Sequence, residues 1–232
     1  MPEIGEVTDY IRVLDRSGYF ETVTLSEDDL KRNDMYRANA QRAKAQSRFA
    51  DYHDYLLSLE MTAEIGDFSP LYLQRITQLT NKSNQFNLTT KRYTAEQMEA
   101  VYNSDEYIRL YGKLYDKFGD NGVVAVTIGK TDSEDKGRLD IELWLMSCRV
   151  LKRDMELAML DSLVEQAKKR GIREIYGHYY PTAKNKMVAG LYESFGFEKI
   201  SQDEECNTAW RLLVEGYEDK NTVIKVKEEH YA

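Results

Sequence analysis

The segment NKSNQFNLTTKRY (residues 81–93) places four amide side chains within seven residues: Asn81, Asn84, Gln85 and Asn87. An amide side chain can both donate and accept hydrogen bonds. Such a run can satisfy the backbone of an irregular loop, as Asn and Thr commonly do. It can equally line a pocket for a polar ligand, and the residues alone leave both interpretations open.

The thiol of Cys148, which opens the segment CRVLKRDMELAML (residues 148–160), is a second candidate. A thiol can carry an acyl group as a thioester, and a neighbouring cation such as Arg149 or a helix N-terminus favours the reactive thiolate. The alternative is a small residue buried at a strand end. His178, on a later strand that we expect to be adjacent, is a candidate base for this thiol, or else a histidine satisfied within its strand.

The composition of the chain narrows the classes of function. A formal net charge of −8 and a pI near 5.1 disfavour non-specific binding to nucleic acid. No apolar run reaches the roughly twenty residues of a membrane span, and the N-terminus lacks the basic and apolar regions of a signal peptide, so we expect a cytoplasmic protein. Cys148 and Cys206 are too few for a disulfide framework or a zinc site, so no metal is expected.

The elements that position these groups follow from periodicity. Residues 1–60 are polar and helical, with too little apolar surface for a core of their own, so they predict a lead-in that packs on a neighbour. Residues 61–216 alternate between strands and helices, and residues 217–232 form a charged tail. The order after residue 60, β-α-α-β-β-β-α-β-α-β, predicts a mixed α/β or α+β sheet.

Several of these elements carry start and stop signals. Ser69-Pro70 opens a helix, Thr94 with Gln97 predicts a capping box for a helix over 95–102, and Gly119-Asp120-Asn121-Gly122 predicts a hairpin turn. The remaining expected elements are strands over 61–68, 107–117, 123–128, 139–150, 172–180 and 208–214, and helices over 155–169 and 185–195.

This order resembles the GNAT fold of the N-acetyltransferase superfamily. In that fold a central strand splays from its neighbour, acyl-pantetheine lies in the gap, and phosphates meet the N-terminus of the following helix, where free N–H groups and the helix dipole attract anions. The resemblance implies cofactor contacts from Arg149, Lys152 and Arg153. The segments YYPTAKN and NKMVAGLYESFGF resemble the family's later region and add Asn185 and Tyr192 as cofactor-binding candidates.

Four motifs in order, NKSNQFNLTTKRY, FGDNGVVAV, WLMSCRVLKRDME and YYPTAKN, resemble the C-terminal half of FkbH-like proteins of the HAD-IIIC family. The resemblance covers nearly the whole chain. It implies a HAD-type phosphatase domain and an acyl carrier protein as partners, a glyceryl group as cargo, a cysteine at the position of Cys148, and a pantetheine pocket lined by the amide run. The chain has no Asp-x-Asp-x-Thr motif, so the phosphatase chemistry is not expected here, and residues 1–60 read as a linker from a missing HAD domain.

The helix start departs from the family pattern. FkbH-like proteins have a Gly-Arg-Gly turn where this chain has Lys152-Arg153-Asp154, and without glycine the backbone approaches a phosphate less easily. The phosphopantetheine of a carrier protein is therefore favoured over acetyl-CoA as cofactor. Three functions remain: an acyl relay to a carrier-protein thiol through Cys148, a CoA-dependent N-acetyltransferase, and a non-catalytic module that docks the HAD domain and the carrier protein.

Overall fold

The computed structural model of the chain describes residues 32–227. Residues 1–31 of the expected lead-in and the last five residues of the expected tail lie outside this range. The chain divides into two compact units, residues 1–43 and residues 44–232. Helix α3 (Arg32–Gln46) lies at the sequence boundary between them. The larger unit carries the sheet, and none of its described helices is long and apolar enough to cross a membrane.

The described part of this unit forms one mixed sheet of nine strands, in the order β7-β8-β6-β5-β4-β3-β1-β9, with the short β2 paired to β5. The β5–β6 and β1–β9 pairs are parallel, and all the other pairs are antiparallel. The strands are β1 (Thr62–Asp67), β2 (Phe86–Asn87), β3 (Tyr107–Asp116), β4 (Gly119–Thr131), β5 (Arg138–Met146), β6 (Glu174–Tyr179), β7 (Glu198–Gln202), β8 (Thr208–Leu213) and β9 (Lys225–Lys227).

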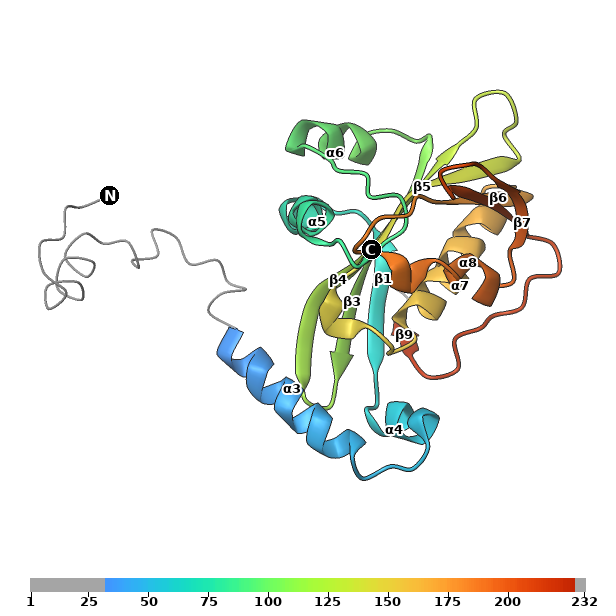
Figure 1. Ribbon diagram of the computed structural model, residues 1–232. Helices are drawn as coiled ribbons and strands as arrows, with labels where there is room; N and C mark the ends of the chain where they lie inside the picture. Colours follow the sequence, from blue (N-terminus) through green and yellow to red (C-terminus); the bar gives the residue numbers. More distant parts are fainter. Residues whose placement is uncertain (1–31, 228–232) are drawn as a thin grey trace, which may run out of the picture. The chain divides into compact units, whose positions relative to one another are not determined.

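Helices cover both faces of the sheet (Figure 1). Helices α5 (Pro70–Lys82) and α6 (Ala95–Tyr102) bury Ile76 and Met98 against one face. Helix α7 (Met155–Lys169), the short α8 (Leu191–Ser194) and α4 (Tyr52–Ser58) contribute to the core on the other face. The bounds of α7 match the expected helix, and α6 starts with the predicted capping box between Thr94 and Gln97.

Two predicted boundaries were wrong. The β3–β4 hairpin turns at residues 117–118, before the Gly-Asp-Asn-Gly segment, because Asp116 Oδ1 accepts a hydrogen bond from Phe118 N at 2.8 Å and Gly119 already pairs with Asp116. The expected helix over 185–195 is interrupted. It consists of a 3-10 turn, η3 (Lys186–Val188), and the four residues of α8, with Gly190 between them.

The C-terminal segment packs on the larger unit as far as Lys227, although the sequence predicted a charged tail from residue 217. On α7, the Asp161 carboxylate accepts hydrogen bonds from Tyr217 Oη at 2.5 Å and from Lys220 N at 2.9 Å. Beyond this anchor, Val223 and Ile224 are buried, and β9 pairs with β1. The compact unit also begins before residue 61, since Leu56 of α4 lies in its core.

Gly177 of β6 provides a test of the core packing. A Cβ added at Gly177 would lie 2.3 Å from the ring of Tyr192, which is buried, whereas a Cβ at Gly190 meets nothing within 4 Å. We expect Gly177→Ala to lower the free energy of unfolding by about 1–3 kcal/mol through overpacking. Gly190→Ala is the matched control and should change it by no more than about 1 kcal/mol. Urea unfolding followed by circular dichroism measures both, and equal effects would contradict the packing described here.

Candidate functional site

Strands β5 and β6 separate after three paired residues. The parallel register joins Arg138–Asp140 to Glu174–Tyr176 and stops there, although β5 continues to Met146 and β6 to Tyr179. The strand that precedes α7 therefore splays from its neighbour, as the resemblance to the GNAT fold implies.

The gap between the two strands is filled by the chain itself. Strand β2 pairs with the far end of β5, with Phe86 opposite Met146 and Asn87 opposite Leu145. The next residue, Leu88, donates its N–H to Trp144 O at 3.1 Å. Its carbonyl accepts the N–H of Tyr180, directly after β6, at 2.9 Å. Residues 86–89 thus form a strap that is hydrogen-bonded to both splayed strands.

Asn185 fixes the strap from the β6 side. Its side chain is fully buried, and Nδ2 donates to Asn87 O and to Tyr180 O, each at 2.9 Å. Its Oδ1 accepts from Thr182 N at 2.7 Å and from Thr182 Oγ1 at 2.9 Å. With its donors and its acceptor engaged within the protein, Asn185 holds the strap.

Most of the amide run serves the loop that carries the strap. Asn81 Nδ2 donates to Tyr93 O at 3.1 Å, and Asn84 Oδ1 accepts from the guanidinium of Arg92. Asn87 is fully buried and its Oδ1 accepts from Thr90 N at 2.8 Å. Asn81 and Gln85 are exposed, and Asn84 is half-buried. Asn81 and Asn87 thus satisfy backbone groups of an irregular loop, whereas Asn84 pairs with a side chain. The cofactor contacts implied for the run stay a prediction.

The start of α7 keeps a glycine-like backbone without glycine. Lys152 has φ +63° and Asp154 has φ +59°, in the left-handed region that costs a non-glycine residue about 1–2 kcal/mol. Tyr52 Oη donates to Lys152 O at 2.6 Å and helps to hold this turn. The side chain of Asp154 makes no cap hydrogen bond to the helix.

The charged side chains at this helix start are of both signs. Arg153 is buried, and its guanidinium lies 3.1 Å from the fully buried carboxylate of Asp116. Burial raises the pKa of Asp154. Burial also raises the pKa of Glu156, in the first turn of α7, to about 7, and its Oε2 has no hydrogen-bond partner among the described residues. Two carboxyl groups thus stand where helix N–H groups would attract an anion, and Arg153 stabilises the fold.

The structure does not bring Cys148 and His178 together. Cys148 is exposed in the 3-10 turn η2 (Cys148–Val150), so it is not the small buried residue of the alternative reading. His178 Nε2 lies 3.3 Å from Asp140 Oδ1. Asp140 is six residues from the end of β5 at Met146, roughly 20 Å at the usual strand rise. Beside the thiol, Arg149 Nε donates to Ser147 Oγ at 3.2 Å.

Tyr192 lies in the core rather than in a pocket. It is 1% exposed and packs against Phe197 and Trp210, with ring centroids 5.0 Å and 6.3 Å away. Burial raises the pKa of its phenol, and the hydroxyl has no partner among the described residues.

Sequence reasoning missed Glu142. A register shift between β4 and β5 makes Glu142 the extra residue of a β-bulge, opposite neither Ile128 nor Gly129. Its carboxylate pairs with Lys91 and accepts from Tyr93 Oη at 3.1 Å, at the wall of a cavity of about 420 Å³. Bulges often aim side chains into functional sites, but in the sequence Glu142 only continues the alternation of an apolar strand.

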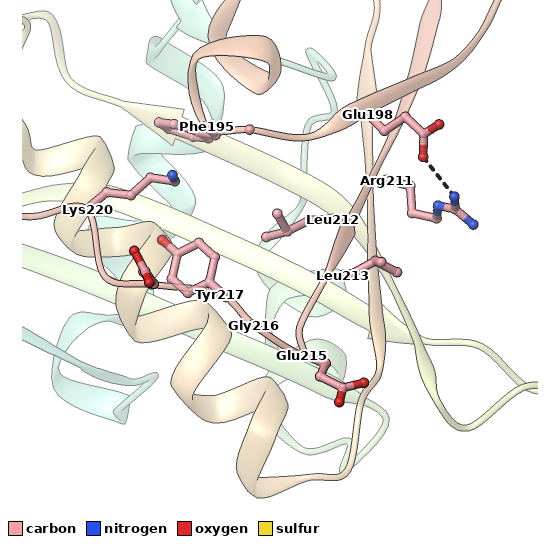
Figure 2. A pocket seen from close by; sticks show the side chains of 11 residues that line it. Phe195, Glu198, Arg211, Leu212, Leu213, Glu215, Gly216, Tyr217 and Lys220 are labelled. Carbon is pink, nitrogen blue, oxygen red and sulfur yellow. Dashed lines mark hydrogen bonds and ion pairs between the residues drawn. The ribbon is translucent and has the colours of Figure 1, made fainter.

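A second cavity, of about 390 Å³, lies between strand β8 and the C-terminal segment (Figure 2). Arg211 and Glu198 form an ion pair at 2.8 Å on one side of it, and Tyr217 and Lys220 lie on the other. None of the predicted site residues lines this cavity. It belongs to the docking of the C-terminal segment and does not contribute to the gap.

No protein-family model and no curated protein sequence matches this chain. Solved structures do. The ribosomal-protein-S18-alanine N-acetyltransferase of Escherichia coli matches with a TM-score of 0.50 at 12% identity over 69% of this chain and 99% of its own. The GNAT domain of S. lividans PAT matches with 0.51 at 14% identity, over 65% and 90%. An acetyltransferase of Thermus thermophilus matches with 0.50 at 12% identity, over 66% and 97%. These likenesses establish the fold: the sheet unit of this chain has the mixed α/β GNAT fold that its element order predicts.

Proposed function

We propose that the sheet unit is an acyltransferase domain that receives an acyl group from the phosphopantetheine arm of an acyl carrier protein as a thioester on Cys148. The observation that carries this proposal is the exposed thiol of Cys148 in the turn directly after β5, at the end of the sheet where β5 and β6 separate. The resemblance to FkbH-like proteins adds a glyceryl group as the cargo and a HAD-type phosphatase domain as the source of the acyl donor.

The transfer exchanges one thioester for another. The Cys148 thiolate attacks the carbonyl carbon of the donor, the carbon–sulfur bond to pantetheine breaks, and the released pantetheine thiolate takes up a proton. Delivery to a second carrier arm is the reverse exchange, so no oxidant or metal is needed.

The electrostatics near the gap favour a carrier protein over free CoA. The carboxyl groups of Asp154 and Glu156 stand at the start of α7, where the diphosphate of CoA would otherwise find helix N–H groups. Exposed lysines at the same end of the sheet, Lys152, Lys184 and Lys186, provide positive charge for an acidic partner, and complementary charge of this kind raises association rates.

Acyl transfer to Cys148 is tested by intact-protein mass spectrometry after incubation with S-acyl-pantetheine or with acyl carrier protein loaded with the same group. We expect one added acyl group on the wild type and none on Cys148→Ala. Cys206→Ala is the matched control, because Cys206 is the other exposed cysteine, and it should be acylated like the wild type.

Equal acylation of the Cys148→Ala variant would contradict the relay. If no variant is acylated and a complex with carrier protein survives Cys148→Ala unchanged, the domain is a docking module instead. Saturable binding of acetyl-CoA with no acyl-enzyme would favour a CoA-dependent N-acetyltransferase.

The buried carboxyl of Glu156 makes the stability of the chain depend on pH. Its pKa in the folded protein is about 7, above the unfolded value of 4.5, so the folded state holds a proton that the unfolded state has released. The contribution of Glu156 to the free energy of unfolding is therefore fully present below pH 4.5 and is lost as the pH rises towards 7.

We expect Glu156→Gln to remove this loss and to be more stable than the wild type at pH 8 by about 3 kcal/mol at most. Urea unfolding at several pH values between 4.5 and 8 measures the difference. Glu165→Gln, on an exposed position of the same helix, is the control and should follow the wild-type profile. If the free energy of unfolding of Glu156→Gln and of the wild type changed with pH in the same way, the carboxyl group of Glu156 would not be buried away from water.

A further inference from the structure

We propose that the strap, residues 86–89, is an autoinhibitory element that occupies the acyl-donor gap and must leave it before a pantetheine arm can enter. This inference rests on the proposed function, because it identifies the state in which the transfer site is closed. Three features of the described residues carry it: the hydrogen bonds of the strap, its anchor at Asn185, and the ion pair of Lys91, two residues after the strap.

The strap uses the backbone groups that an extended ligand would need. It pairs with β5 at Leu145 and Met146. Leu88 N donates a hydrogen bond to Trp144 O, and Thr89 Oγ1 donates one to Glu142 O at 2.7 Å. A pantetheine arm is a narrow, extended chain with two amide groups, and in this gap it has the same edge of β5 to bind. Strap and arm therefore exclude each other.

The strap is held by buried contacts on both sides. The side chains of Phe86 and Leu88 lie in the core that α7 and α8 share, with Leu88 completely buried. The side-chain amide of Asn185 donates to the carbonyl oxygens of Asn87 and Tyr180, and Tyr180 directly follows β6. A single side chain thus ties the strap to the loop after β6, and its loss should loosen the strap without removing core volume.

Beyond the strap, the chain also lines the cavity at Glu142. Thr90 turns with φ +55°, an uncommon conformation for a β-branched residue, and the Asn87 carboxamide holds it through the bond to Thr90 N. The next residue, Lys91, places its ammonium on the Glu142 carboxylate and 5.0 Å from the ring centroid of Tyr93. Residues 86–91 therefore fill the gap with backbone and neutralise the bulge carboxylate with their own ammonium group.

The anchor is tested with Asn185→Asp. The carboxylate keeps the acceptor for Thr182 but loses both donors, and it places an oxygen against the carbonyls of Asn87 and Tyr180. We expect hydrogen exchange at Leu88 N and Thr90 N to accelerate by at least about tenfold, since two buried hydrogen bonds are lost. Asn207→Asp, at a half-buried Asn between β7 and β8, is the control and should leave these amides protected.

Ligand access is measured in parallel with S-acetylpantetheine, in a Cys148→Ala background so that no transfer occurs. We expect Asn185→Asp to bind this probe at least about fivefold more tightly than the Asn185 parent, because the open state is populated more often. In the Asn185 parent, saturating probe should itself remove the protection of Leu88 N and Thr90 N, which tests the proposal even if Asn185→Asp fails to fold.

Two outcomes would contradict the proposed role of the strap. In the first, the probe binds while Leu88 N and Thr90 N stay protected from exchange. In the second, these amides exchange faster in Asn185→Asp, but the affinity for the probe is unchanged. Neither result depends on acylation. Conversely, if the probe opens the strap but Cys148 of the wild type is never acylated, the proposed acyl relay is wrong and the proposed role of the strap stands.

Discussion

The architecture of the site depends on the loss of pairing between two parallel strands. After Asp140 and Tyr176, the backbone groups on the facing edges of β5 and β6 need other partners, because unpaired buried N–H and C=O groups are costly. Residues 86–89 supply them with a β2–β5 pair and the bond from Tyr180 N to Leu88 O. The unsatisfied edges of the two strands thus explain why a segment of the chain lies between them.

This constraint explains why the amide run and Asn185 occur in segments nearly a hundred residues apart. A strap of a few residues between two strands has too little surface to stay in place by apolar contact alone. Its own carboxamides fix the loop on one side, and Asn185 fixes its backbone on the other. Asn87 and Asn185, for which the resemblance implies cofactor contacts, make these hydrogen bonds within the chain.

The sequence predicted the elements that depend on local side-chain caps and periodicity. It did not predict the strands and side-chain positions that depend on contacts with residues distant in the chain. The capping box at Thr94, the span of α7 and the mixed sheet follow from periodicity and side-chain caps. Strand β7 has every residue exposed and so carries no alternating pattern, and β9 is ordered through the anchor at Asp161 and its pairing with β1. At the site, the exposure of Cys148, the burial of Arg153 and the bulge at Glu142 all depend on partners distant in the chain.

The start of α7 reaches its backbone conformation without glycine. The backbone of Lys152 and Asp154 adopts the left-handed conformations that glycine would take at lower cost, so the shape of the turn does not require glycine. The side chains at this turn serve the fold: Arg153 is paired with Asp116, and Glu156 is held where burial raises the pKa of its carboxyl group. The turn before α7 thus keeps left-handed residues without glycine, and the buried pair of Arg153 with Asp116 and the hydrogen bond from Tyr52 Oη to Lys152 O help to offset the conformational cost.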